Sequence, residues 1–310
     1  MGIMRLVLDY SLCFGTSAIL SHLLSALHSS SGYNSLYILF GGYLLTYIVT
    51  PYKTEGYASP WFQKLPIWKY MMRYFPGSIT VEEPLDAQTQ YIFCAFPHGC
   101  CTVNHGLTMT DACGMLSRIY PGDRRDLAAS ILFFIPIIRE ILLLWGNVDA
   151  GGATAHYNLN RRRSLMIFIG GEKEQLLTQP NHHQIVIRER KGFIKLSLQY
   201  GCSLVPMYCY GENELYFVSD FLLDFRKYLQ HNFQIGIPIC FGVFGTLIPY
   251  KNALSIEMGR PIQVEKIAKE NITQQNIDDL HQQFVAEMER FFERTKKKYG
   301  VPADVKLSII

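Results

Sequence analysis

The stretch YIFCAFPHGCCTVNHG, residues 91–106, joins an apolar run to a histidine. Residues 91–95 are aromatic or otherwise apolar, and Pro97 cannot donate a hydrogen bond to a neighbouring strand, so the pattern predicts a buried strand that ends before His98. In α/β folds the ends of such strands face a crevice. His98 is therefore a candidate to contact a ligand, although a lone histidine after a strand is more often a structural residue.

Short apolar runs continue beyond this stretch and alternate with helical patterns. The predicted strands are residues 91–95, 165–169, 185–188, 204–210 and 254–258. Gly201 ends one short helical pattern, and apolar residues recur at helical spacing over residues 277–292. This alternation predicts an α/β fold with a mixed central sheet flanked by helices.

The composition favours contact with a membrane over contact with nucleic acid. Hydrophobic residues make up 49% of the 310 residues and charged residues only 18%, which is apolar for a soluble domain. A formal net charge of +3 gives no case for a nucleic-acid partner, although a local basic patch would suit anionic lipid or a phosphate-bearing substrate. The eight cysteines form no CxxC pair, so we expect reduced thiols in a cytosol-facing protein.

Two apolar segments near the N-terminus, residues 6–27 and 33–50, are each long enough to span a bilayer. A short polar linker joins them. Arg5 precedes the first and Lys53 follows the second, so the positive-inside tendency places both ends in the cytosol. The sequence predicts a two-helix transmembrane hairpin over residues 1–52. A signal peptide is the alternative for the first segment, although the second would still anchor the chain.

The remaining chain divides into a connector and a larger domain. Residues 53–90 interleave Trp and Tyr with basic residues, a mixture that suits a membrane interface, and residues 91–310 contain the predicted sheet. A third apolar stretch, residues 131–146, carries Arg139 and Glu140 near its middle. Charges at that depth of a bilayer cost a few kcal/mol each, so we expect this stretch to be buried or to lie on the membrane surface.

Acidic side chains follow two further predicted strands, as His98 follows the first. Glu172 and Glu174 come after the glycine pair Gly170 and Gly171, and Glu212 comes after Gly211. Glycine allows close approach of a ligand to the backbone. A carboxylate that accepts a hydrogen bond from a neutral imidazole fixes its tautomer and raises its basicity, as a general base requires. The spacing leaves open which glutamate contacts His98, and each could instead be a solvated turn residue.

Two other chemistries are less well supported by the pattern. Cys100 and Cys101 stand beside His98 without an acidic partner, so inert packing is preferred to a thiol nucleophile. A metal site made of His98, His105 and these thiols would need a further distant ligand. We therefore expect no metal site.

The motifs together resemble the diacylglycerol acyltransferase type 2 family, which also includes monoacylglycerol and wax-ester-forming acyltransferases. The resemblance covers about three quarters of the chain and rests on RYFPGSI, FPHG, IPIIRE, GNVDAGGA, GGEKEQL, RKGFIKLSLQYGCSLVPMYCYGENELY, GRPI and KKKYGVP. It implies a glycerolipid acyltransferase-like fold and transfer of a fatty acyl group from acyl-CoA to the hydroxyl of diacylglycerol. No cofactor is implied beyond acyl-CoA as co-substrate.

The resemblance also assigns roles to individual residues. The His-Pro-His-Gly motif of the family falls on Phe96, Pro97, His98 and Gly99, so Phe96 replaces the first histidine and is expected only to shape the pocket. His98 is the expected general base, with Glu174 orienting it. The expected substrate-binding residues are Phe96, Pro97, Gly99, Arg139, Gly170, Gly171, Arg190, Lys191, Gly192 and Glu212, with Arg139, Arg190 and Lys191 as candidates for binding the phosphates of CoA.

The implied mechanism is direct attack of the acceptor hydroxyl on the thioester, with backbone donors near Gly99 or a nearby cation stabilising the oxyanion. The expected location is the endoplasmic reticulum membrane, multi-pass, with the catalytic domain in the cytosol, and lipid droplets as a second location. The expected partners are acyl-CoA, diacylglycerol and the bilayer, without nucleic acid, and self-association is left open. The alternatives are acylation of monoacylglycerol or a long-chain alcohol, and a non-catalytic lipid-binding or droplet-anchoring protein.

Overall fold

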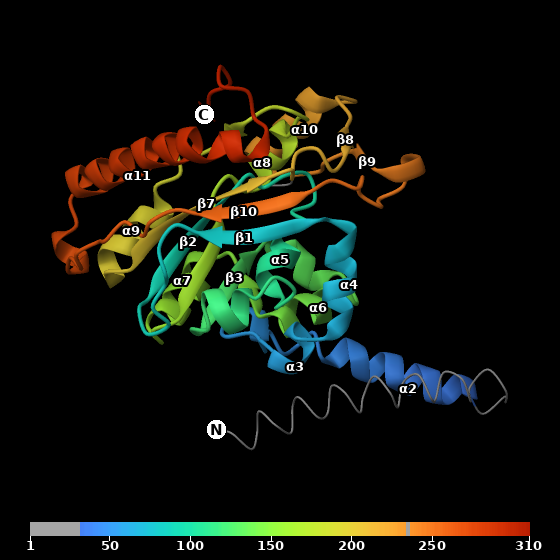
Figure 1. Ribbon diagram of the computed structural model, residues 1–310. Helices are drawn as coiled ribbons and strands as arrows, with labels where there is room; N and C mark the ends of the chain where they lie inside the picture. Colours follow the sequence, from blue (N-terminus) through green and yellow to red (C-terminus); the bar gives the residue numbers. More distant parts are fainter. Residues whose placement is uncertain (1–31, 234–235) are drawn as a thin grey trace.

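The computed structural model describes residues 32–233 and 236–310, which form a mixed central sheet covered by helices on both faces (Figure 1). The seven strands of the sheet lie in the order β1-β10-β7-β2-β5-β3-β4. All neighbouring pairs are parallel except β10 and β7. The predicted mixed α/β class is therefore confirmed.

The strands are short, and the four remaining ones form two small two-stranded sheets, β6 with β11 and β8 with β9. Their bounds are β1 (Gly77–Val81), β2 (Tyr91–Phe96), β3 (Arg124–Ala128), β4 (Asn147–Asp149), β5 (Ser164–Phe168), β6 (Gln184–Ile185), β7 (Ser203–Tyr210), β8 (Phe217–Val218), β9 (Cys240–Phe241), β10 (Leu254–Met258) and β11 (Ser308–Ile309).

The helices mostly follow the strands of the central sheet. The α-helices are α2 (Gly32–Leu45), α3 (Pro60–Gln63), α4 (Pro66–Tyr74), α5 (His105–Met109), α6 (Ile138–Trp145), α7 (Gly152–Leu159), α8 (Gly171–Leu177), α9 (Gly192–Tyr200), α10 (Leu223–Phe233) and α11 (Gln274–Thr295). The short helical turns are η1 (Pro51–Lys53), the π-helical η2 (Met115–Ile119), η3 (Ser130–Phe134), η4 (Val243–Gly245), η5 (Lys269–Asn271) and η6 (Lys296–Tyr299).

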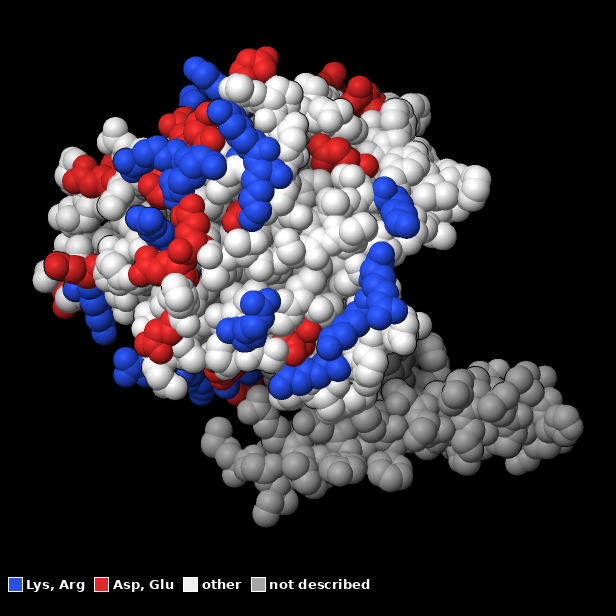
Figure 2. All heavy atoms as spheres, viewed as in Figure 1, with Lys and Arg blue, Asp and Glu red and all other residues white. Residues whose placement is uncertain are grey.

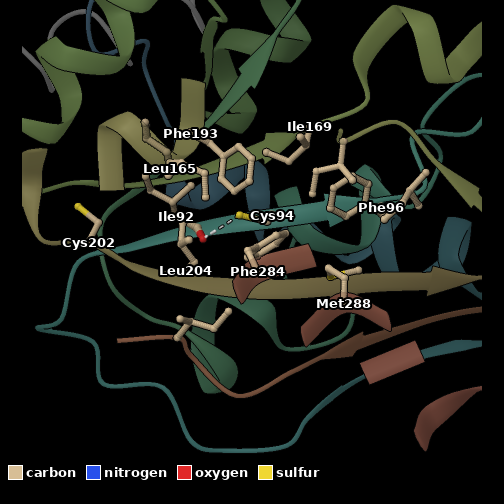
Figure 3. Close-up of a cluster of buried hydrophobic side chains, with 14 of the residues drawn as sticks. Ile92, Cys94, Phe96, Leu165, Ile169, Phe193, Cys202, Leu204, Phe284 and Met288 are labelled. Carbon is tan, nitrogen blue, oxygen red and sulfur yellow. Dashed lines mark hydrogen bonds between the residues drawn. The ribbon is translucent and has the colours of Figure 1, made fainter. Parts of the chain in front are cut away.

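Two hydrophobic cores lie on opposite faces of the sheet, because successive side chains of a strand point to opposite sides. On β2, Ile92, Cys94 and Phe96 face the first core, where they meet side chains from β5, α9 and α11 (Figure 3). Phe93 and Ala95 face the second core, with α5 and η2. A central strand buried on both faces is the usual reason for an uninterrupted apolar run such as residues 91–96.

Helix α11 contributes most of the covering on the first face (Figure 1). Its side chains Phe284, Phe291 and Phe292 are fully buried, and burying each contributes about 1.5 to 3 kcal/mol. The predicted helical stripe over residues 277–292 is therefore confirmed as core. Thr273 caps the first turn by accepting a hydrogen bond from the backbone N–H of Asn276.

Most predicted strands are found at the predicted positions, and one is not. Residues 91–95, 165–169, 204–210 and 254–258 correspond to β2, β5, β7 and β10 within one residue. Residues 185–188 were expected to form a strand of the main sheet, but only Gln184 and Ile185 are extended, and they pair with β11. The neighbouring strands β3 and β4, at one side of the sheet, were missed because each carries charged residues in a short run.

The predicted N-terminal hairpin lies only partly within the residues that the structure describes. Residues 6–27 lie outside the described residues. In the second segment, the described residues Gly32–Leu45 form α2. In the described ranges, no helix has the length and apolar character needed to cross a bilayer. The helix ends at Leu45 because the next three residues form i→i+3 turns.

The predicted connector, residues 53–90, contributes to the main sheet. Its strand β1 pairs with β10 from Gly77 to Val81, so the sheet draws on residues before residue 91. Residues 131–146 form η3 and α6 on the surface of the domain. Ile131, Phe134 and Ile137 expose 58–71% of their surface, so these side chains lie on the surface and not in the core.

Candidate active site

The loop of residues 97–104, here called the His98 loop, lies at the carboxyl edge of the sheet. It follows β2, whose neighbours in the sheet are β7 and β5. Because these three strands are parallel, their carboxyl ends lie at one edge, and each is followed by a predicted site residue: Glu212 after β7, His98 after β2 and Glu174 after β5. Two buried carboxylates therefore flank the His98 loop.

Glu174 holds the loop through its backbone. One carboxylate oxygen accepts a hydrogen bond from the backbone N–H of His98, and the other accepts one from the N–H of Val186 at 2.9 Å. The neighbouring Gln175 donates to the carbonyl oxygen of Cys100 at 2.6 Å. The prediction that Glu174 orients the imidazole is therefore wrong for this structure, because both carboxylate oxygens bind backbone donors.

Glu212 holds the other end of the loop in the same way. Its two carboxylate oxygens accept hydrogen bonds from the backbone N–H groups of Val103 and Asn104, each at 2.8 Å. Gly99 has a φ of +67°, and a Cβ at that position would lie 2.4 Å from Cγ of Glu212. Glycine is required at residue 99 because the loop passes directly over Glu212.

The other glycines singled out in the sequence also make room for protein atoms. A Cβ on Gly170 would lie 1.9 Å from a carboxylate oxygen of Glu174, and one on Gly211 would lie 1.8 Å from the carbonyl oxygen of Ala253. Gly171 has a φ of +54° at the start of α8. At Gly170 and Gly211 the close approach expected for a ligand is made by the protein itself.

The imidazole of His98 is half-buried and contacts the loop that carries it. Its Nδ1 lies 3.0 Å from the carbonyl oxygen of Gly99 and 3.0 Å from the hydroxyl of Thr102. A carbonyl oxygen can only accept a hydrogen bond, so Nδ1 carries the hydrogen and Nε2 keeps its lone pair. The ring meets the edge of Phe168 with a centroid distance of 5.8 Å.

Burial shifts the titration of all three groups towards their neutral forms. It lowers the pKa of His98 to about 4, although the hydrogen bond to the carbonyl of Gly99 opposes the shift. It raises the pKa of Glu174 to about 7 and that of Glu212 to about 8, in each case against the effect of the two backbone N–H donors. The site is therefore poor in charge at neutral pH.

A second histidine lies behind the first, on the same face of the sheet. Nε2 of His105 lies 3.0 Å from the carboxylate of Asp126, which also pairs with Arg124 at 2.7 Å. All three side chains are buried. Phe168 separates the two imidazoles, with its ring 4.8 Å from that of His105. This network supports the second core and leaves His98 as the more accessible imidazole.

A cleft of about 820 Å³ opens on the other face of the sheet, between α7 and α9. Four cations line it together with apolar side chains: Arg190, Lys191, Lys195 and Lys269 with Leu127, Ile167, Ile169, Leu196 and Ile277. Gly192 also lines it, at the start of α9. The backbone N–H of Arg190 binds the carbonyl oxygen of Ile187, and the adjacent Val186 binds Glu174, so this end of the cleft adjoins the His98 loop.

Most of the chain that carries the His98 loop matches a known protein family. The family model described as diacylglycerol acyltransferase matches residues 30–310. The chain belongs to the diacylglycerol acyltransferase family. It is an acyltransferase, as its relatives are named.

Two relatives show how far the similarity of this acyltransferase extends. It is 32% identical over 265 residues to the human "Diacylglycerol O-acyltransferase 2", covering 81% of this chain and 68% of the relative. It is 29% identical over 315 residues to the mouse "2-acylglycerol O-acyltransferase 1", covering 94% and 93%. A solved structure, the 1-acyl-sn-glycerophosphate acyltransferase PlsC from Thermotoga maritima, covers 95% of both chains with a TM-score of 0.47 and 10% identity, too little to support a conclusion.

Three residues predicted to bind substrate in this acyltransferase are buried or paired with other side chains of the protein. The side chain of Phe96 is buried in the first core, 1% exposed. Arg139 is buried and binds the end of α2, donating to the carbonyl oxygen of Thr46 at 2.8 Å and pairing with Glu140 at 2.7 Å. Lys191 pairs with Asp278 at 2.6 Å on the rim of the cleft. Arg139 is therefore unable to bind CoA phosphates in this arrangement.

Other contacts at the site escaped the sequence analysis. Thr102, Gln175 and Asp126 make polar contacts at or behind the His98 loop, and Cys240 lies beside Cys101. Thr102 is four residues from His98 and has a φ of 52°, a combination that marks a tight turn only once the backbone is known. Gln175 stands beside Glu174 in the GGEKEQL motif, whereas Asp126 and Cys240 come from distant parts of the chain and no local pattern points to them.

Proposed function

We propose that this acyltransferase transfers a fatty acyl group from acyl-CoA to the free hydroxyl of diacylglycerol, forming triacylglycerol. The observation that carries the proposal is the imidazole of His98, half-buried at the carboxyl edge of the sheet, on a loop held at both ends by buried carboxylates. Relatives named for diacylglycerol and for 2-acylglycerol acylation support the substrate class.

His98 acts as the general base in the proposed mechanism. An alcohol is far too weakly acidic to ionise at neutral pH, so it must lose its proton as it attacks the thioester carbonyl. Nε2 of His98 has the lone pair to take that proton, because the carbonyl oxygen of Gly99 keeps the hydrogen on Nδ1. The thioester is already activated, so no covalent enzyme intermediate is required.

The oxyanion formed in that step needs hydrogen-bond donors. The backbone N–H groups of His98, Val103 and Asn104 are bound to the two glutamates, so the candidate donors are those of residues 99–102, in the turn of the loop. Fixed backbone donors of this kind stabilise an oxyanion by several kcal/mol. We assign the oxyanion contact to one or more donors within residues 99–102.

The cleft between α7 and α9 is the proposed site of the CoA moiety. Its volume of about 820 Å³ suits a nucleotide-sized ligand, and Arg190, Lys195 and Lys269 supply charge for phosphates. Lys191 is less available because Asp278 pairs with it. The cleft and the His98 imidazole lie on opposite faces of the sheet, so the pantetheine arm would pass the carboxyl edge near Gly170 to reach the His98 loop.

Attachment to the cytosolic face of the endoplasmic reticulum membrane is also proposed. Large apolar side chains are exposed on α2, on the stretch 131–138 and around β8 and β9, where Phe244 is 98% exposed. On the face shown in Figure 2, charges of both signs gather over α11, whereas the tip that protrudes beyond β8 and β9, at the upper right of the view, shows none. An apolar surface of this extent supports contact with a lipid surface, from which diacylglycerol would enter the site.

A related acceptor is the second candidate. Monoacylglycerol is favoured as the alternative because the mouse relative named for 2-acylglycerol acylation matches 94% of this chain, and a long-chain alcohol remains a third acceptor to test. The general-base chemistry is the same for all three hydroxyls, so the acceptor depends on the shape of the lipid site and not on His98.

The test uses microsomes from a yeast strain that lacks neutral-lipid synthesis and expresses the wild-type chain, His98→Ala or His182→Ala. His182 is exposed and its imidazole contacts the carbonyl oxygen of Pro180, so it serves as the matched control. Labelled acyl-CoA is supplied with diacylglycerol, monoacylglycerol or a long-chain alcohol. Triacylglycerol formed by the wild type and His182→Ala but lost in His98→Ala supports the proposal. Undiminished activity in His98→Ala would refute the mechanism, and no product from any acceptor would favour a lipid-binding protein.

A further inference from the structure

Three cysteine side chains converge beside the His98 loop. Cys100 and Cys101 belong to the loop, and Cys240 is the first residue of β9, 139 residues beyond Cys101. The Sγ atoms of Cys101 and Cys240 are 3.6 Å apart, and the three sulfurs lie within 4.8 Å of one another. Within residues 32–233 and 236–310, this is the group of Cys, His and acidic side chains that converges closely enough to hold one metal ion.

The spacing of the sulfurs is close to that of a metal–thiolate centre. Zn²⁺ binds thiolate sulfur at about 2.3 Å, and tetrahedral angles then place neighbouring sulfurs about 3.8 Å apart. One pair of sulfurs already has this separation, and the others need shifts of about 1 Å or less, which side-chain rotation provides. Soft sulfur donors without an oxygen or nitrogen partner select Zn²⁺ or Cu⁺ over Mg²⁺, Ca²⁺ or Mn²⁺.

The surroundings of the three thiols provide an entry path for an ion. Cys100 and Cys240 are buried, whereas Cys101 is exposed, so an ion can enter from the solvent on the side of Cys101. The loop is fixed independently by Gln175, which donates to the carbonyl oxygen of Cys100.

We propose that Cys100, Cys101 and Cys240 form a binding site for a thiophilic metal ion, Zn²⁺, with three protein ligands and a fourth position open to solvent at Cys101. The ion would join the His98 loop to β9, two segments that are far apart in the sequence. This inference departs from the expectation of no metal site, which considered His98, His105, Cys100 and Cys101 but not Cys240. It does not depend on the proposed acyl transfer.

The test is titration of the full chain, in detergent with a phosphine reductant, with Zn²⁺ and with Cd²⁺ as a spectroscopic probe. We expect one Cd²⁺ per chain with thiolate-to-metal charge-transfer absorption in the ultraviolet, and a rise in the unfolding temperature on addition of Zn²⁺, because an ion that binds only the folded state stabilises it. Competition with a chromophoric chelator gives the affinity for Zn²⁺. In Cys101→Ser we expect that affinity to fall at least about tenfold, because one of three thiolates is lost.

Two variants make the result specific. Cys101 is exposed, so Cys101→Ser is expected to fold even if a change at the buried Cys240 does not. Cys113→Ser removes a half-buried thiol outside the cluster and should bind Zn²⁺ as the wild type does. Equal affinity in Cys101→Ser and the wild type would overturn the proposal. The absence of Cd²⁺ absorption would also overturn it. A third contrary result would be a disulfide between Cys101 and Cys240 whose thiols, once reduced, bind no metal ion.

Discussion

The carboxylate of Glu174 binds the backbone N–H of His98 and not its imidazole. Glu174 was expected to orient the imidazole of His98, but it fixes the position of the His98 backbone instead. The imidazole takes its contacts from Gly99 and Thr102, within its own loop. Glu174 is therefore a positioning residue, and its removal should affect the placement of His98 before it affects the chemistry of the ring.

Replacing Glu174 by Gln tests this role. The amide oxygen can still accept one hydrogen bond, but the amide NH₂ faces the second backbone donor, so either His98 or Val186 loses its acceptor. We expect a loss of about 1 to 3 kcal/mol in unfolding free energy and a fall of about tenfold in kcat. Denaturant unfolding and the microsomal assay measure the two effects. Glu83→Gln, at an exposed position, should match the wild type in both, and a Glu174→Gln variant that also matched it would contradict the assignment.

The pH dependence of stability gives a second test of Glu174. Burial raises its pKa to about 7 from 4.5, so between these pH values the folded protein holds a proton that the unfolded chain has released. The contribution of this side chain to stability is therefore largest below about pH 4.5 and is lost as the pH rises through 7. The groups near it are Arg190, which lowers its pKa, and the buried phenol of Tyr208.

We expect the wild type to lose up to about 3 kcal/mol more unfolding free energy than Glu174→Gln between pH 5 and pH 8. Comparing the two proteins removes the titration of groups that they share, such as Glu212. Parallel pH curves for wild type and variant would show that Glu174 is ionised at both pH values.

Gly99→Ala should destabilise the His98 loop. The residue has a φ of +67°, and its new Cβ would lie 2.4 Å from Cγ of Glu212, so both the backbone and the glutamate would have to move. We expect a loss of about 2 kcal/mol or more in unfolding free energy, with a parallel loss of activity. Gly106→Ala is the matched control, because it lies in α5 with no atom within 4 Å of the added Cβ. Equal stability of the two variants would contradict the observed approach of Glu212.

Arg139→Ala should release the end of α2 from the domain. The guanidinium binds the carbonyl oxygen of Thr46, pairs with Glu140 and lies 4.5 Å from the ring of Tyr47. Its removal leaves Glu140 without its cation, and we expect faster proteolysis within residues 46–50 and a loss of about 2 to 4 kcal/mol. The KM for acyl-CoA should stay unchanged. Arg118→Ala, at an exposed position, controls for the loss of one charge. A rise in KM without faster proteolysis would restore the predicted phosphate-binding role.

The cations of the cleft should act on substrate affinity alone. Replacing Arg190 and Lys195 together by Gln removes two charges from the proposed CoA site, so we expect KM for acyl-CoA to rise about tenfold or more with kcat nearly constant. Lys297→Gln removes a charge from the exposed turn after α11 and should leave both constants unchanged. An unchanged KM in the double variant would move the CoA site away from this cleft.

The sequence by itself was sufficient to predict the central strands, the C-terminal helix and the position of His98 after β2. Residues 91–96 are apolar throughout because β2 is buried on both faces, and residues 277–292 show helical spacing because one face of α11 is buried. The neighbouring positions of His98, Glu174 and Glu212 could also be expected, since each follows a strand of a sheet whose central strands are parallel. These features depend on which positions of a segment are buried, and the apolar or polar type of each residue indicates this directly.

Only the tertiary structure decided which atoms meet. Arg139 and Glu174 carry the charges expected of a substrate site, but packing directs the first to the end of α2 and the second to the backbone of His98. Cys240 joins Cys101 from a separate small sheet. Such contacts depend on where distant segments of the chain lie in the fold. The local sequence around a charged or thiol side chain is the same whether its partner is a ligand, a metal ion or another part of the chain.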